Sequence, residues 1–307
     1  MIVITEFMDQ APIDGLAQDF RVLNDPSLAD AQEKIPALLS EATALIVRNR
    51  TQVTADLLAA APNLKVVGRL GVGLDNIDLV ACADRNVAVI PATGANNLSV
   101  AEYVISTAMQ LLRGAYQSHG AMMAGSWPRQ ACAGREIFGK TLGLVGFGAI
   151  AQHTAGLARG LGMHVVASDP FLQDDHPAWS ETERISLDDL LDTSDVVSLH
   201  TPLTEETRHL INAPRLSQMK SDAILINAAR GGVVDEAALV DALKTDALGG
   251  AALDVFETEP LSAEAAQLFD GVPNLILTPH IAGVTEESNV RVSAMIADKV
   301  REVLTGG

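Results

Sequence analysis

The chain has 307 residues, enough for two domains of ordinary size that each bury a core of their own. Its formal net charge is −18 and only 4% of its residues are aromatic. Nucleic-acid binding depends on phosphate neutralisation by lysine and arginine and, for single strands, on aromatic stacking, so nucleic acid is not expected as a partner. An anionic ligand would have to be met by a few local arginines acting against the net charge.

The two cysteines, Cys82 and Cys132, match no metal-ligand spacing, so reduced thiols and no metal site are expected. The N-terminal sequence MIVITEFMDQ lacks the basic and apolar regions of a signal peptide. No apolar run approaches the length that spans a bilayer. A cytoplasmic location without a membrane partner is therefore expected.

Short β-branched apolar runs alternate with helical patterns in the first part of the chain. The runs predict buried strands at 2–5, 44–49, 64–70 and 87–92, with helical patterns at 26–40 and 54–62. Such alternation is typical of a doubly wound parallel sheet with helices on both faces.

A longer helical pattern covers residues 98–123 and begins with Ser99 and Glu102 in the spacing of a capping box. Its apolar stripe predicts a packed helix, which could also bridge domains or contact a second subunit.

A second alternating set follows this helix. It predicts six strands at 142–145, 164–167, 196–199, 223–227, 250–255 and 275–277. This set matches the size of a dinucleotide-binding fold. The segment after Gly283 predicts a terminal helix that packs back on the first domain. We therefore expect an α/β protein with two Rossmann-like doubly wound parallel-sheet domains, one discontinuous (1–97 and 284–307) for substrate, and one (98–283) for NAD.

A G-x-G-x-x-A spacing is formed by Gly146, Gly148 and Ala151, between a predicted strand and a predicted helix. The first glycine permits a tight turn, the second lets the backbone approach a pyrophosphate, and the small third residue lets helix and strand pack closely. Asp169 ends the next predicted strand, where a carboxylate would bind a ribose diol and repel a 2′-phosphate. NAD is therefore predicted in preference to NADP. The alternative to any cofactor binding is a Rossmann-like domain that has lost its ligand.

Arg230, Glu259 and His280 each follow an apolar strand of the second set. Ligands of open α/β sheets bind outside the carboxyl ends of the strands, so these side chains are expected to converge near the cofactor. Individually they could be a turn residue, a solvated loop carboxylate and a strand-end histidine.

Successive blocks of the sequence resemble the D-isomer-specific 2-hydroxyacid dehydrogenase family, most closely its phosphoglycerate-dehydrogenase-like branch. The blocks are VVGRLGVGLDNID, GKTLGLVGFGAIA, SLHTPLTEETRHLIN, INAARGGVVDEAALVDAL, GGAALDVFETEP and LTPHIAG, in order and over nearly the whole chain. The resemblance implies an NAD-dependent oxidoreductase that interconverts a D-configured 2-hydroxy acid and its 2-keto acid by hydride transfer.

By that resemblance, Arg230 holds the substrate carboxylate, His280 is the acid/base, and Glu259 orients the histidine. The resemblance also implies cofactor contacts at Gly146, Gly148, Ala149, Ile150, Asp169, Thr201, Ala228, Ala229, Arg230, Asp254, His280 and Gly283. Ala149 departs from the polar or basic residue of many relatives, so only backbone contacts are expected there. The family further implies a homodimer through the long first helix of the nucleotide domain and a neighbouring loop.

Substrate contacts are implied in the first domain at Arg48, Arg50, Arg69, Val72, Gly73 and Asn96. Val72 and Gly73 would donate main-chain amides, and the three arginines favour a substrate with a second anionic group, although Arg50 could instead face solvent. The stretches VRNRTQV and PATGANN resemble those of sulfolactate dehydrogenases, so 3-sulfolactate is favoured over 3-phosphoglycerate. A glyoxylate or hydroxypyruvate reductase and a non-catalytic NAD-sensing protein stay open as alternatives.

Overall fold

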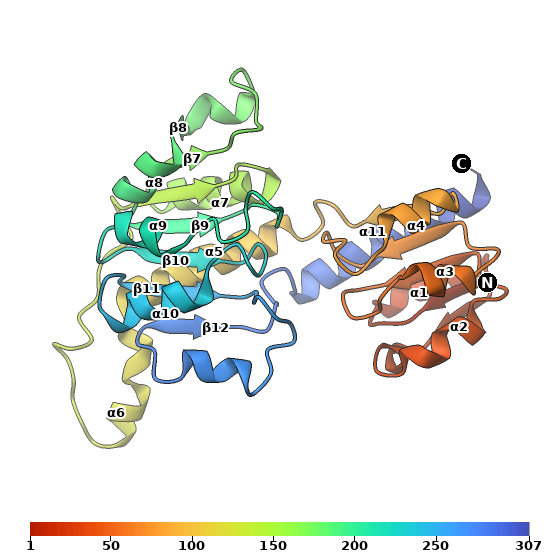
Figure 1. Ribbon diagram of the computed structural model, residues 1–307, viewed down its shortest axis with the longest axis horizontal. Helices are drawn as coiled ribbons and strands as arrows, with labels where there is room; N and C mark the ends of the chain where they lie inside the picture. Colours follow the sequence, from red (N-terminus) through yellow and green to blue (C-terminus); the bar gives the residue numbers. More distant parts are fainter. Residues whose placement is uncertain (307) are drawn as a thin grey trace. The chain divides into compact units, whose positions relative to one another are not determined.

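The computed structural model describes residues 1–306, and the chain separates into two compact units. The first unit contains Met1–Asn96 and the segment that begins at Val284, and the second contains Asn97–Gly283. Each unit is a parallel sheet flanked by helices (Figure 1). The fold class predicted from the sequence is therefore confirmed.

The first unit is built on a five-stranded sheet of order β2-β1-β3-β4-β5. Its strands are β1 (Ile2–Ile4), β2 (Val22–Asn24), β3 (Ala44–Val47), β4 (Val66–Arg69) and β5 (Ala88–Pro91). All of them pair in parallel, and every residue of β3 is fully buried. Burial on both faces explains why the central strands are continuous apolar runs.

Helices cover this sheet on both faces. They are α1 (Gln10–Ala17), α2 (Ile35–Leu38), α3 (Ala55–Ala59), α4 (Leu79–Asp84) and the terminal α11 (Glu286–Thr305), with 3-10 turns η1 (Pro26–Ala29) and η2 (Gln32–Lys34). The blue α11 returns to the red and orange N-terminal sheet in Figure 1, where it packs against β4. A Cβ atom at Gly68 of β4 would lie 2.7 Å from Ile296 of this helix, so the close packing requires glycine there.

Two details of the first unit differ from the sequence prediction. Segment 26–40 is not one helix, because Pro36 lacks an amide hydrogen and starts the short α2 instead. The edge strand β2 was not predicted, because its sequence Val-Leu-Asn carries no long apolar run.

The second unit contains a seven-stranded parallel sheet of order β12-β11-β10-β9-β6-β7-β8. Its strands are β6 (Thr141–Val145), β7 (His164–Ser168), β8 (Glu183–Arg184), β9 (Val196–Leu199), β10 (Ile224–Asn227), β11 (Gly250–Leu253) and β12 (Leu275–Leu277). Six correspond to predicted strands, and the two-residue, exposed β8 was not predicted.

The helices of the second unit surround two buried clusters, one on each face of its sheet. They are α5 (Asn97–Arg113), α6 (His119–Met123), α7 (Ala149–Gly160), α8 (Leu187–Thr193), α9 (Ala213–Gln218) and α10 (Glu236–Lys244), with 3-10 turns η3 (Ala115–Ser118), η4 (Pro177–Glu181) and η5 (Ala265–Phe269). In the part of the chain that the structure describes, no helix is long and apolar enough to cross a membrane.

The predicted helix over 98–123 is wrong as a single element. Helix α5 ends at Arg113, and Gly114 adopts a left-handed φ of 59° before the chain continues through η3 and α6. Ser99 is buried inside α5 rather than at its N-terminus, so the predicted capping box does not start this helix.

Candidate active site

The order of the seven strands reverses between β6 and β9, where the chain crosses from one half of the sheet to the other. A dinucleotide binds at such a reversal, outside the carboxyl ends of the strands. The loops at this edge after β6, β7, β9, β10, β11 and β12 carry the residues predicted for cofactor binding and catalysis.

The Gly-rich turn after β6 has the shape that its motif predicts. Gly146 has a φ of 87°, and a Cβ atom there would lie 2.7 Å from the carbonyl oxygen of His200. Gly148 is the N-cap of α7, without a side-chain cap, and a Cβ atom there would have nothing within 4 Å. Ala151 is fully buried, which lets α7 pack closely. The turn therefore presents bare backbone amides at a helix N-terminus, where an anion is favoured.

Thr201 gives an independent indication that a ligand fits here. Its Oγ1 is buried and has no hydrogen-bond partner among the described residues. Its Cγ2 lies 3.2 Å from the position of a Cβ on Gly146, so the hydroxyl lies beside the Gly-rich turn. Because a buried hydroxyl without a partner is unfavourable, this residue and the free amides of the turn fit a polar, phosphate-containing cofactor.

Asp169 follows β7 and holds the Gly-rich turn as well as its own loop. Its Oδ2 accepts the amide of Phe147 at 2.8 Å, and its Oδ1 accepts the amides of Phe171 and Leu172 at 2.8 and 3.0 Å. A carboxylate offers about four acceptor positions, so about one remains for a ribose hydroxyl. The sequence did not predict this bracing of the turn.

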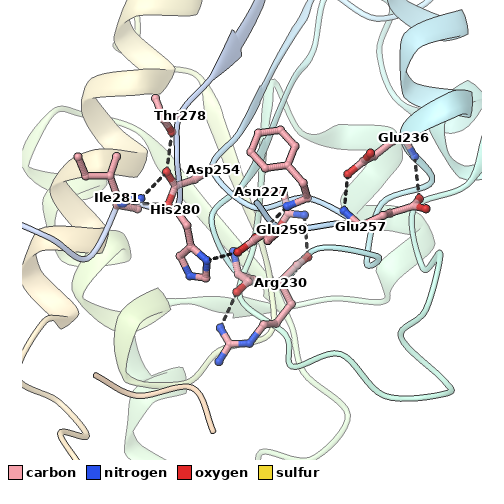
Figure 2. A network of polar contacts seen from close by, with 12 residues as sticks. Asn227, Arg230, Glu236, Asp254, Glu257, Glu259, Thr278, His280 and Ile281 are labelled. Atoms are coloured by element: carbon pink, nitrogen blue, oxygen red, sulfur yellow. Dashed lines mark hydrogen bonds and ion pairs between the residues drawn. The ribbon is translucent and has the colours of Figure 1, made fainter. Parts of the chain in front are cut away.

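His280 and Glu259 lie together, as their placement at strand ends predicts. The Nδ1 atom of His280 lies 2.7 Å from Oε2 of Glu259 (Figure 2), and the side chains are 40% and 32% accessible, respectively. Burial alone would raise the pKa of Glu259, but the hydrogen bond and charge of His280, the amide of Phe256 and the charge of Arg230 lower it overall. The carboxylate accepts, so Nδ1 carries the proton and Nε2 is the nitrogen available for proton exchange.

Arg230 lies in the turn after β10, which Asn227 shapes. The buried Asn227 donates to the carbonyl oxygen of Arg230 at 2.9 Å and accepts the amide of Ala229 at 3.1 Å. The structure therefore brings Arg230 close enough to Glu259 for their charges to interact (Figure 2). Ala228 and Ala229 belong to the same turn, and Gly283 is the last residue of this unit.

Asp254 was predicted as a cofactor contact, and the structure shows that it braces the turn of His280. It is 1% exposed. Its Oδ1 accepts from Thr278 Oγ1 at 2.6 Å and from the amide of Ile281 at 2.8 Å, and its Oδ2 accepts the amide of Ala282 at 2.8 Å. His280 has a left-handed φ of 53°, a conformation that needs such support.

Tyr103 of α5 extends this network. Its hydroxyl lies 2.6 Å from Oγ1 of Thr278, and because that threonine donates to Asp254, the tyrosine is the donor. Burial raises the pKa of Tyr103. Sequence reasoning missed Tyr103, Thr278 and Asn227, since each acts through partners that only the fold brings close.

Six of the seven predicted substrate residues lie in the first unit, and Arg230 lies in the second. Arg48 directly follows β3 and Arg69 ends β4, and the neighbouring strands place Val47 opposite Arg69 at one edge of the sheet. In the loop after β4, the amides of Val72 and Gly73 donate to no acceptor among residues 1–306. The side-chain oxygen of Asn96 is also buried without a partner in that range.

The buried side chain of Glu6, a residue that is 4% exposed, holds the loop after β3 by hydrogen bonds. Its carboxylate accepts the amides of Arg48, Arg50 and Thr51 at 2.8, 3.1 and 2.9 Å. Sequence reasoning missed this acid, although an acidic residue directly after a buried strand was a usable signal.

The three arginines differ in their surroundings. Arg48 donates to Oδ1 of Asn289 at 2.8 Å, and burial lowers its pKa. Arg50 forms an exposed ion pair with Asp30, and Arg69 donates to the carbonyl oxygen of Leu70 at 3.2 Å. The guanidinium of Arg50 is therefore already ion-paired with a carboxylate of its own unit. In residues 1–306, no group of three or more His, Cys, Asp or Glu side chains could hold a metal ion.

Fold and site together define a dinucleotide-dependent enzyme with a His–carboxylate pair. Residues 105–282 match the family model of the D-isomer specific 2-hydroxyacid dehydrogenase, NAD binding domain. The chain is 53% identical over 304 residues to the (S)-sulfolactate dehydrogenase of Chromohalobacter salexigens, with 99% of this chain and 98% of the relative covered. It is 38% identical to the D-3-phosphoglycerate dehydrogenase of Synechocystis sp., over 99% of this chain and 54% of the relative.

Among solved structures, the D-lactate dehydrogenase of Aquifex aeolicus complexed with NAD and lactic acid is similar, with a TM-score of 0.87 and 28% identity over 99% of this chain and 95% of that one. The chain thus belongs to the D-isomer specific 2-hydroxyacid dehydrogenase family. It is an NAD-dependent enzyme that interconverts a small 2-hydroxy acid and its 2-keto acid.

Proposed function

We propose that Arg230, Glu259 and His280 carry the reaction and that the substrate is 3-sulfolactate or a closely similar dianionic 2-hydroxy acid. The observation that supports the catalytic part is the 2.7 Å contact of His280 Nδ1 with Glu259 Oε2 beside the turn of Arg230. The observation that supports the substrate is the 53% identical relative named for sulfolactate, which matches over nearly both whole chains.

In this proposal each side chain has one task. The guanidinium of Arg230 binds the substrate carboxylate as a planar fork. Nε2 of His280 takes the proton of the 2-hydroxyl during oxidation, or returns it to the keto oxygen during reduction. Glu259 stabilises the imidazolium that forms and fixes the ring. Bound NAD would supply hydride exchange with C2 of the substrate, and Gly146, Gly148 and Thr201 would hold its phosphates and Asp169 a ribose.

The first unit is proposed to bind the substrate. Arg48 and Arg69 lie at the carboxyl ends of the adjacent strands β3 and β4. They lie beside a loop whose amides at Val72 and Gly73 are free for an anion. Guanidiniums and main-chain amides suit a sulfonate or phosphate, which offers several acceptor oxygens. 3-Phosphoglycerate is the second candidate, because the phosphoglycerate dehydrogenase that the chain matches is 38% identical, against 53% for the sulfolactate relative. The chain spans about half the length of that phosphoglycerate dehydrogenase.

The test is a substrate panel. Initial rates with NAD and with NADP would be compared for sulfolactate, phosphoglycerate, glycerate and lactate, each in both directions where the keto acid is stable. We expect sulfolactate with NAD to give the highest kcat/KM. Rates on glycerate and lactate equal to those on the dianionic acids would refute the dianionic substrate. A preference for hydroxypyruvate, the keto acid of glycerate, would support a reductase, and NAD binding without turnover would support a sensing protein.

A homodimer is proposed through α5, α6 and the loop that follows. Large apolar side chains in this part of the second unit are strongly exposed: Tyr116 by 74%, Met123 by 76%, Trp127 by 77% and Phe138 by 75%. Such a concentration is unusual for a surface that faces water and fits contact with a second copy of the chain. Light scattering during gel filtration measures the mass, and Trp127→Ser should shift it from dimer to monomer.

A further inference from the structure

A second His–carboxylate cluster lies next to the proposed catalytic pair. Glu257 is two residues before Glu259 in the loop after β11, and its Oε1 lies 3.1 Å from Nε2 of His209. Its amide donates to Oε1 of Glu236 at 2.7 Å, and its carboxylate accepts the amide of Glu236 at 3.4 Å. Figure 2 shows this reciprocal contact beside the His280–Glu259 pair.

Glu236 does not serve as the cap of its own helix. The N-cap of α10 is Asp235, whose Oδ1 accepts the amide of Ala238 at 3.0 Å. A carboxylate in the first turn of a helix interacts favourably with the positive end of the helix dipole, whichever hydrogen bonds its oxygens make. Here the carboxylate is instead directed to the amide of Glu257, on a loop that carries a proposed catalytic residue.

The cluster also joins the loop of Glu259 to the turn of Arg230. His209 donates its amide to the carbonyl oxygen of Gly232 at 2.7 Å and has a left-handed φ of 50°. In the same turn, a Cβ atom on Gly231 would lie 1.7 Å from the carbonyl oxygen of Phe256, so the two loops touch through backbone. Any shift of the Phe256–Glu257 backbone would therefore move both proposed catalytic loops.

The arrangement brings like charges together. Burial, together with the charges of Glu257 and Glu259, raises the pKa of Glu236, while the amide of Glu257 and the charge of His209 oppose this. The charged groups facing Glu236 are thus Glu257, Glu259 and His209, and Arg230 faces Glu259 in turn. Carboxylates held together against their repulsion are concentrated at functional sites.

We propose that Glu236 is a positioning residue for the proton-transfer pair. Its carboxylate holds the amide of Glu257, and His209 holds the side chain of the same residue, so that Glu259 meets Nδ1 of His280. This inference rests on the proposed roles of Glu259 and His280.

The experiment compares Glu236→Ala, Glu236→Gln and the wild type. Glu236→Ala removes the acceptor, and we expect kcat to fall roughly tenfold with the Kd for NAD unchanged, since a small misplacement of a catalytic group slows the chemical step. Glu236→Gln keeps an oxygen acceptor and should recover most of that kcat. Because it removes a negative charge that favours imidazolium, the midpoint of the pH profile of kcat/KM should move to lower pH by about half a unit.

Two further variants separate this inference from folding effects and from the proposed function. Asp188→Ala removes an exposed acid from the first turn of α8 in the same unit and should leave kcat and the pH profile as in the wild type. His209→Asn keeps a residue that tolerates the left-handed region but removes the contact with Glu257, so it should lower kcat several-fold even if Glu236→Ala does not fold.

The outcomes are distinct. If His280→Gln retains turnover, the proposed function fails. If His280→Gln abolishes turnover, the test passes to Glu236→Ala, or to His209→Asn where Glu236→Ala does not fold. The positioning role is overturned if that variant keeps kcat within about twofold of the wild type and the pH midpoint within about 0.1 unit, which is about the precision of such assays. A loss of kcat that Glu236→Gln does not recover would also contradict it.

Discussion

Asp254→Asn tests whether the hydrogen bonds of a buried carboxylate hold the turn of His280 in place. In the wild type, three donors converge on Asp254, namely Thr278 Oγ1 and the amides of Ile281 and Ala282. The asparagine keeps one acceptor oxygen and places an NH2 group against at least one donor. At 1% exposure, water cannot replace the lost acceptor.

The expected loss of stability is about 3 kcal/mol, because a hydrogen bond to a charged group and the burial of an unsatisfied amide each contribute about 1.5 kcal/mol or more. For a unit of this size the corresponding fall in Tm is about 6 to 12 °C. The left-handed φ of His280, 53°, is then free to relax. We expect kcat to fall by roughly one to two orders of magnitude as the imidazole moves.

Urea unfolding, steady-state kinetics and quenching of protein fluorescence by NAD measure the three effects separately. Asp241→Asn, an exposed aspartate of α10, is the matched control and should change none of them. If Asp254→Asn weakens NAD binding while stability stays within about 0.5 kcal/mol of the wild type, the spread of neutral surface substitutions, Asp254 contacts the cofactor and the bracing argument is wrong.

The remaining predictions use the same assays. His280→Gln should abolish turnover and keep NAD binding, and retained turnover would contradict the proton-transfer role. Arg230→Lys should raise KM and lower kcat, since a point charge replaces a planar fork; unchanged kinetics would exclude bidentate binding. Arg50→Ala should weaken the binding only of substrates with an anionic tail. Asp30→Asn removes the ion-pair partner of Arg50 and should strengthen the binding of the same substrates. Burial lowers the pKa of His200 from 6.5 to about 4, so it stabilises the fold above pH 6.5, and about 3 kcal/mol should be lost as pH falls from 6.5 to 4. Urea unfolding of His200→Gln should lack that part of the pH dependence.

The strands could be predicted where the chain carries a mainly apolar run. The fully buried Val196–Leu199 and the partly buried edge strand Leu275–Leu277 both have the bounds that their apolar runs indicate. The short strands β2 (Val-Leu-Asn) and β8 (Glu-Arg) could not be predicted, because neither sequence contains such a run. The end of α5 was missed because glycine is tolerated within helices, and only the structure shows Gly114 in a left-handed conformation.

The polar supports of the site could not be predicted from local sequence. Asp254 lies 24 residues from Thr278, and Glu236 lies 21 residues from Glu257, so each contact forms only when parallel strands align their carboxyl ends. A strand-end aspartate was visible in the sequence, and its assignment to the cofactor followed from family resemblance. Its hydrogen-bond partners show that it also supports the turn of His280, and its contact with the cofactor stays a prediction.

The proposed catalytic side chains come from loops after three adjacent strands, β10, β11 and β12, and each loop has its own buried or half-buried polar support. Asn227 shapes the turn of Arg230, Glu236 holds the loop of Glu259, and Asp254 holds the turn of His280. A hydride-transfer site tolerates little misplacement, because the barrier depends steeply on how the reacting groups are aligned. These supports all belong to the second unit, whereas the arginines proposed to select the substrate belong to the first. Substitution at Arg48, Arg50 or Arg69 should therefore alter substrate choice without displacing the proton-transfer pair.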